Sequence, residues 1–257
     1  MKRRSFIKGA ATVAAASAIN PLSAQQTTVS NKDLYELREY HFSGGGGARQ
    51  LKSYIENAVI PLMNKSGIKV GAFGEYSLEE PPTIYILFVY PNYQAFFEMQ
   101  AEMQVNKTYI EAAESYLKSD PANPVFTRYE TYLMEAFDGI PQLKVPEKSR
   151  GLFEWRTYES YNEDAGKRKI EMFNKEELPL FEKVGLHPVF FGKILAGKQM
   201  PALSYLLWFN DMEERTTNWG KFGSSPEWNT MRSKPEYANT VSRVNKKFLV
   251  PLNYSQI

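Results

Sequence analysis

Two stretches decide the fold: "LYELREYHF" (Leu34–Phe42) and "LFEWRTYES" (Leu152–Ser160), which begin 118 positions apart. Both place a Glu, an Arg and a Tyr at alternate positions. Alternation predicts a β-strand, because successive side chains of a strand point to opposite faces. The sequence therefore predicts two related strands, one at the start of each half of the chain.

The two stretches belong to a longer internal repeat. When the chain is shifted by 118 positions, 10 of the 41 residues from Leu34 to Gly74 are identical without a gap. Self-similarity of this length indicates a duplication. We therefore expect an export signal (1–24), a leader segment (25–33), a first domain (34–137), a linker (138–151) and a second domain (152–257).

Residues 1–24 have the layout of an export signal. They begin with the adjacent Arg3 and Arg4 of "RRSFIKG", continue as an uncharged Ala-rich run, and end in small residues at Ala24. This pattern is typical of a bacterial twin-arginine signal cleaved after Ala24. We expect a periplasmic or otherwise exported protein, with no segment after Ala24 long and apolar enough to span a membrane at about 20 residues.

The composition excludes several classes of function. Four of the 31 basic residues, and none of the 29 acidic ones, lie in residues 1–24, so the rest of the chain has a net charge of about −2. Such a chain has no basic surface that would indicate a nucleic-acid partner. The chain contains no Cys, which excludes disulfides, thiolate metal sites and a Cys nucleophile.

Each copy predicts the same order of elements. In the first copy these are a strand at 34–42, a helix with an apolar stripe from Leu51 to Met63, a hairpin of strands near 70–76 and 83–90, a helical stretch at 92–117 and a strand at 126–134. Strand, helix, strand, strand, helix, strand is the ferredoxin-like order, which leaves one face of the sheet bare. We expect an α+β fold of tandem ferredoxin-like units, whose sheets cover each other in an intrachain pseudo-dimeric α+β barrel.

The alternating motif supplies the candidate site. We expect the apolar residues of the two stretches, such as Tyr35 and Trp155, to pack under the helices. The alternating Glu, Arg and Tyr residues should then point into the space between the sheets. There they form either an ion-pair cluster that only fixes the register or a binding site for a small polar or anionic ligand. On the last strand of the first copy, Arg128, Glu130 and Tyr132 also share a face and should lie beside the first strand. The candidate ligand-binding residues are Glu36, Arg38, Tyr40, Glu154, Arg156, Tyr158, Trp219 and Trp228.

Several of these motifs, taken in order, resemble the NIPSNAP family. They are "YELREYHF", a helix that ends in Pro-Leu with four residues between this pair and Gly67, "GAFGEY" from Gly71, and "NWGKFGSSPEWNTMR" from Asn218. The resemblance covers nearly all of the chain after the signal as two tandem domains, and it implies the dimeric α+β barrel. It implies little about activity, because bacterial members lack an agreed molecular function. The first copy departs from the family with "FFEMQAEMQVNKTYIEAAE" in its second helical stretch, so the two halves should have different cavities.

Other candidate motifs are weaker. Neither His41 nor His187 belongs to a metal-spacing motif, so no metal is expected, although some proteins of this barrel fold hold haem through a His. "SGGGGARQ" from Ser43 lacks the spaced glycines of a dinucleotide site and predicts a flexible turn. Pro61 and Pro179 predict a bend late in the first helix of each copy. "SSPEW" predicts a helix start with Ser225 as the cap.

We expect a protein that binds a small-molecule ligand or a protein partner without a cofactor, and that could also form a homo-oligomer. The alternative is a cofactor-independent monooxygenase-like enzyme, in which Arg38, Arg156, Tyr40 and Tyr158 orient a substrate oxyanion. A module with a purely structural role is the third hypothesis. Glu36 and Glu154 could face each other across the barrel, but their partner arginines would keep both ionised and unsuited to act as a general acid.

Overall fold

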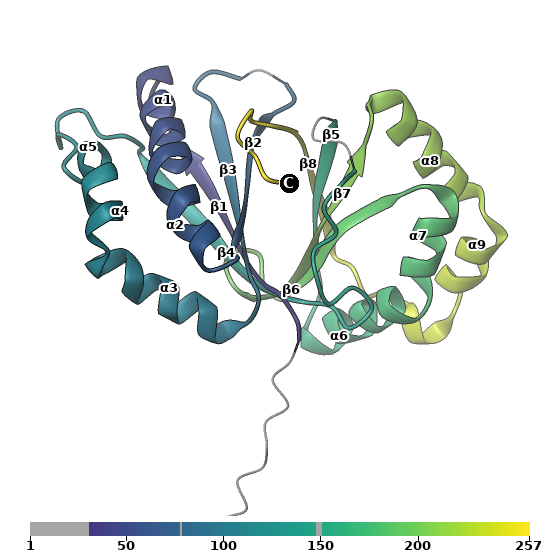
Figure 1. Cartoon of the computed structure of the whole chain (residues 1–257). Helices are drawn as coiled ribbons and strands as arrows, with labels where there is room; N and C mark the ends of the chain where they lie inside the picture. Colours follow the sequence, from purple (N-terminus) through teal and green to yellow (C-terminus); the bar gives the residue numbers. More distant parts are fainter. Residues whose placement is uncertain (1–30, 78, 148–150) are drawn as a thin grey trace, which may run out of the picture.

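The computed structural model describes residues 31–77, 79–147 and 151–257 (Figure 1). The expected export signal and residues 25–30 lie outside the described residues, as do residues 148–150 of the expected linker. Among the described residues, no helix combines the length and the apolar character that crossing a membrane requires.

The first part of the chain has the predicted order of elements. Its first helical segment consists of α1 (Gly45–Tyr54), a π-helical turn η1 (Ile55–Val59) and α2 (Ile60–Lys65). Its second consists of α3 (Tyr93–Val105), α4 (Lys107–Ala112) and α5 (Glu114–Leu117). Its strands are β1 (Leu34–His41), β2 (Lys69–Glu75), β3 (Thr83–Tyr90) and β4 (Arg128–Ala136).

The second part repeats this order. Its first helical segment consists of α6 (Glu163–Met172), a π-helical turn η2 (Phe173–Glu177) and α7 (Leu178–Val184). Its second consists of α8 (Met212–Ser224), α9 (Pro226–Arg232) and the 3₁₀ turn η3 (Pro235–Tyr237). Its strands are β5 (Leu152–Glu159), β6 (His187–Ala196), β7 (Ala202–Phe209) and β8 (Arg243–Pro251).

Local sequence explains where the helices begin and bend. The side chains of Asn92 and Asp211 cap α3 and α8, and Ser225 caps α9 as expected, with its Oγ accepting from the Trp228 N–H at 3.2 Å. Pro61 and Pro179 each follow a π-helical turn. A proline cannot donate to the preceding turn of a helix, and the wider π turn accommodates this loss in both parts.

The eight strands close into one antiparallel barrel in the order β1-β3-β2-β8-β5-β7-β6-β4. Two junctions join the parts: β2 pairs with β8 through Phe73–Glu75, and β4 pairs with β6 through Leu133–Ala136. Figure 1 shows α1–α5 on one side of the barrel and α6–α9 on the other. The α+β barrel predicted from the sequence is therefore present.

Chain segments that follow β4 and β8 cover the edges of β6 and β2 next to these junctions. The backbone N–H groups of Val70 and Ala72 donate to the side chains of Gln256 and Ser255, at 2.9 and 3.0 Å. Ile257 packs into the barrel interior. Near the other junction, the Lys144 N–H donates to the carbonyl of Val189 at 2.9 Å.

The expected assignment of strand faces is wrong. Tyr35, Leu37, Phe153 and Trp155 fill the barrel interior, together with apolar residues from both parts. Glu36, Arg38 and Tyr40, and likewise Glu154, Arg156 and Tyr158, lie on the opposite faces, under the helices. The barrel interior is filled mainly with apolar side chains, which cannot solvate buried charges. On the helix side, Glu36 finds its partners on β1 and β3, and Glu154 is also reached by Arg215 and Trp219 of α8.

Candidate functional site

The predicted site residues form two separate clusters, one in each part. Glu36 and Arg38 of β1 lie between the sheet and the helices α1–α5, and Glu154 and Arg156 of β5 lie under α6–α9. Because both pairs point away from the barrel interior, Glu36 and Glu154 do not face each other across it. This corrects the expectation of a single charge cluster between the sheets.

In the second part, one buried carboxylate accepts four hydrogen bonds. Glu154 is 0% exposed and accepts from Arg156 Nη1 at 2.8 Å, from Arg215 Nη2 and Nε at 2.8 and 2.9 Å, and from Trp219 Nε1 at 2.7 Å. Burial acts to raise the pKa of Glu154, but the hydrogen bonds from Arg215 and Trp219 and the two guanidinium charges lower it below its usual value. Glu154 is therefore ionised at neutral pH.

This cluster carries an excess of positive charge. Two guanidinium groups, those of Arg156 and Arg215, share the single carboxylate of Glu154. The Nε atom of Arg156 is buried without a hydrogen-bond partner. The Arg156 guanidinium lies 4.4 Å from the centroid of the Trp219 ring, and its Nη2 donates to the Tyr158 hydroxyl at 3.1 Å.

Trp228 belongs to the same layer but not to this hydrogen-bonded group. Its ring packs on Phe222, with the centroids 4.7 Å apart, and lies 5.7 Å from the ammonium of Lys169. Lys169 forms a buried ion pair with Glu177. Burial raises the pKa of Glu177 by more than the Lys169 charge lowers it.

The cluster of the first part is electrically balanced. Glu36 accepts from Arg38 Nε at 2.6 Å and from the Tyr90 hydroxyl at 3.1 Å. The Arg38 guanidinium lies between two aromatic rings, 5.0 Å from the centroid of Phe88 and 5.4 Å from that of Tyr129. Tyr40 lies beside it, 5.1 Å from the Tyr129 ring.

The difference between the clusters arises in the second helical segments, where the sequences of the two copies differ. When α3 and α8 are aligned on their caps, Phe96 occupies the position of Arg215, and Gln100 that of Trp219. Phe96 packs edge-on against Tyr90, and the side-chain nitrogen of Gln100 is buried without a partner. The first part therefore lacks the second guanidinium.

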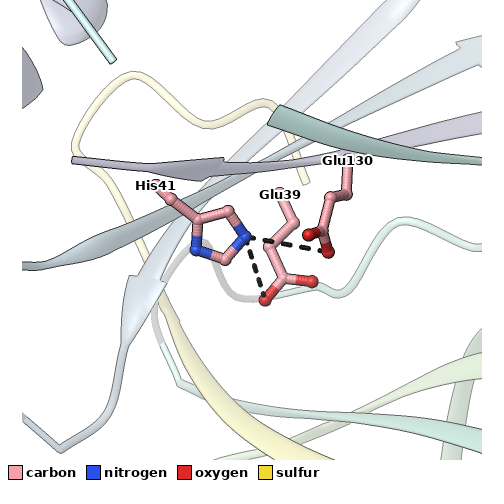
Figure 2. Close-up of side chains that lie close together, drawn as sticks. All are labelled: Glu39, His41 and Glu130. Carbon is pink, nitrogen blue, oxygen red and sulfur yellow. Dashed lines mark ion pairs between the residues drawn. The ribbon is translucent and has the colours of Figure 1, made fainter. Parts of the chain in front are cut away.

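A third polar group lies at one mouth of the barrel. Figure 2 shows His41 of β1 directed toward Glu39 of the same strand and Glu130 of β4. Its Nε2 lies 4.0 Å from Glu39 Oε1 and 3.8 Å from Glu130 Oε2, and it is buried without a hydrogen-bond partner. Lys247 and Lys198 contact the same two carboxylates.

Sequence reasoning missed this group because its members are far apart in the chain. Glu130 is 89 positions from His41, and no short motif joins them. The available signal was the predicted adjacency of the first and last strands, which in the structure places Glu39 directly opposite Glu130. Strand alternation then puts His41 on the face of Glu39.

A small cavity of about 220 Å³ lies at the same mouth. Part of its wall is formed by Tyr132 and Trp155, whose rings pack edge-on with centroids 5.5 Å apart. Lys247 also lines the cavity and contacts Glu39. A larger groove of about 610 Å³ runs along α6 and the β4–β6 junction. Neither Arg38 nor Arg156 lines these two cavities.

Solved structures with the same fold include two described as putative monooxygenases and one described as anthrone oxidase-like. A "putative monooxygenase" from Lactobacillus acidophilus matches with a TM-score of 0.58 at 11% identity, covering 86% of this chain and 94% of its own. A "putative monooxygenase" from Fusobacterium nucleatum matches with a TM-score of 0.53 at 11% identity, covering 86% and 93%. An anthrone oxidase-like protein gives a TM-score of 0.50 at 7% identity, covering 87% and 93%. These structures share the α+β barrel with this chain, and at such identities the likeness shows the fold alone.

The sequence comparison is more specific for the second part. Residues 153–256 match the NIPSNAP family model, so this part carries a NIPSNAP domain. Among curated proteins, no sequence matches the chain. The matched range includes all members of the Glu154 cluster.

Proposed function

We propose that the protein binds a small organic anion in the NIPSNAP domain, between the sheet of the second part and helices α6–α9. The observation that carries the proposal is the excess of guanidinium charge, since Arg156 and Arg215 share one carboxylate. A buried cation that its own partner does not neutralise attracts an anion.

The groups around Arg156 indicate the chemistry of the ligand. Its unpartnered Nε can donate to an acceptor atom, and the adjacent Trp219 offers a flat apolar wall. Arg156 and Arg215 retain 13% and 16% of their side-chain exposure, so solvent reaches part of each side chain, although Arg156 Nε itself is buried. An aromatic or planar carboxylate or phenolate would replace that solvent, with its ring near Trp219 and its oxygens at the guanidinium groups.

The organisation of the chain completes the proposal. Within the barrel the strands of the first part lie in the order β4-β1-β3-β2, and those of the second part in the equivalent order β8-β5-β7-β6. This order supports two tandem ferredoxin-like units that form an intrachain pseudo-dimer. The sequence of residues 1–24 supports export through a twin-arginine signal to the periplasm. The ligand would then be a molecule that enters or is produced in that compartment.

The second candidate function is a cofactor-independent oxygenase that acts on the same kind of anion. The barrels described as monooxygenases and as anthrone oxidase-like favour it. Tyr158 would act as a hydrogen-bond donor, since burial raises its pKa by more than Arg156 lowers it and keeps the phenol protonated. Arg156 would hold the substrate oxyanion.

The test compares small molecules that co-purify with the protein from the native periplasm. Mass spectrometry of the wild-type protein should find an organic anion, which Arg156→Ala loses. Arg38→Ala is the matched control, because it removes the equivalent guanidinium from the balanced cluster of the first part and should retain the anion. Identical small-molecule content in all three proteins would refute the proposal. Oxygen consumption with the identified anion then separates the enzyme from the binding protein.

A further inference from the structure

We propose that Glu39, His41 and Glu130 bind a divalent transition-metal ion, with Zn²⁺ as the reference ion, at one mouth of the barrel. One ligand atom from each of these residues lies within 4.8 Å of the other two. Figure 2 shows the imidazole with Nε2 turned toward both carboxylates. This site is separate from the proposed anion site, which lies on the other face of the sheet, beneath the helices.

The geometry is close to that of a metal site. His41 Nε2 lies 3.8 and 4.0 Å from the nearest oxygens of Glu130 and Glu39. Tetrahedral zinc, with bonds of about 2.0–2.1 Å, separates neighbouring ligand atoms by about 3.3 Å. The two carboxylate oxygens therefore need to move about 0.5–0.7 Å closer to His41 Nε2, and closer to each other from a separation of at most 4.8 Å, which rotation of the two Glu side chains can supply.

Two features of this cluster favour a cation. The Nε2 atom of His41 is buried without a hydrogen-bond partner, although buried polar atoms are normally paired. Glu39 stands directly opposite Glu130 in the β1–β4 ladder, so two carboxylates lie beside the same imidazole. An ion among the three side chains would use the free imidazole lone pair and both carboxylates.

Two lysines compete for the same oxygens. Lys247 Nζ lies 3.2 Å from Glu39 Oε1, and Lys198 contacts Glu130 Oε2, the two oxygens that face His41. Their side chains are 41% and 53% exposed, so each ammonium can move into solvent when a metal binds.

The donor set selects the class of metal. One imidazole and two carboxylates suit Zn²⁺, Mn²⁺ or Fe²⁺, whereas Mg²⁺ and Ca²⁺ prefer sites built from oxygen alone. Three protein ligands leave a position for water or a further ligand. The 220 Å³ cavity that shares Lys247 with the cluster provides room at this mouth.

The first experiment titrates chelator-treated protein with Zn²⁺ against a chromophoric competitor. One equivalent should bind to the wild type, and Mg²⁺ should not replace it. His41→Gln should weaken binding by about 100-fold or more, because loss of even an outer-shell partner costs 10–100-fold. His187→Gln is the matched control: His187 lies 3.3 Å from a single carboxylate, that of Glu214, and its loss should change nothing.

A second experiment tests the proposed metal site even if His41→Gln fails to fold. Lys198→Met removes a competing ammonium and should tighten Zn²⁺ binding by about two- to fivefold, whereas Lys183→Met, whose partner Glu227 lies elsewhere, should not. Anomalous scattering from a zinc-soaked crystal should place the ion among Glu39, His41 and Glu130. Absence of Zn²⁺ binding, equal binding by folded His41→Gln, or an ion at His187 instead would overturn the proposal.

Discussion

Arg215 of α8 and Glu154 of β5, 61 positions apart in the chain, are joined by two hydrogen bonds of 2.9 and 2.8 Å. This paired contact fixes the position of α8 on the sheet, because both ends of the guanidinium fork meet the same carboxylate. At the equivalent position of the first part, Phe96 makes an aromatic contact instead. The two halves thus hold their second helical segments by different chemistry.

Replacing Arg215 by Ala should lower the free energy of unfolding by about 2–4 kcal/mol. The buried Glu154 would keep Arg156 and Trp219 but lose two charged hydrogen bonds. Urea denaturation measures the loss. Lys118→Ala, which breaks an exposed ion pair with Glu114, is the control and should have no measurable effect. Equal stabilities for the wild type and Arg215→Ala would contradict this prediction.

The acid stability of the protein should depend on Glu154. Its pKa in the folded protein is lowered, so its contribution is present above the unfolded value near 4.5 and is lost as the pH falls through the folded pKa. The stability difference between the wild type and Glu154→Gln should therefore shrink as the pH falls from 6 to 3. Urea denaturation at each pH measures it, and a constant difference would argue against the assignment.

Glu177→Gln should show the opposite dependence on pH. Burial raises the folded pKa of Glu177, so its contribution is present below the unfolded value and is lost as the pH rises through the folded pKa. Relative to the variant, the wild type should therefore lose stability as the pH rises from 4. The same denaturation series measures this, and a slope of the same sign as that for Glu154→Gln would show that the assignment is wrong.

Two glycines at equivalent positions should respond differently to Ala. Gly67 and Gly185 have positive φ angles of 69° and 81°, a region that costs other residues about 1 kcal/mol. A Cβ at Gly67 would meet nothing within 4 Å, whereas one at Gly185 would lie 2.9 Å from the side-chain nitrogen of Asn218. Gly185→Ala should therefore lower the melting temperature more than Gly67→Ala, and the reverse order would contradict the packing around Asn218.

The two parts should unfold together. Phe73 and Phe153 meet edge-on inside the barrel, with centroids 4.9 Å apart, so the parts share one core. Phe153→Ala should cost about 3–5 kcal/mol and leave a single transition. All four Trp residues lie after position 151, so their fluorescence follows the second part, while circular dichroism follows both. Two separate transitions would show that the parts are independent.

The sequence predicted the order of elements and the barrel because strand alternation and the helical stripe are local signals. It could not predict which face of β1 lies inside, because both faces carry large rings: Tyr35 on one and Tyr40 on the other. The deciding partners, Arg215 and Trp219, reach Glu154 only through the tertiary fold. The cluster at the barrel mouth was missed for the same reason, since it depends on the pairing of β1 with β4. Whether Trp219 and Trp228 contact a ligand stays a prediction.

The closed barrel restricts how a protein partner could bind. Among residues 31–77, 79–147 and 151–257, every strand pairs with a neighbour on both sides, and the segments after β4 and β8 bond to the strand edges beside the junctions. A partner that recognises proteins by adding its own strand needs a free sheet edge. Any protein that recognises this molecule would therefore have to read side chains on its helices and loops, and the same closure protects the fold from edge-to-edge aggregation.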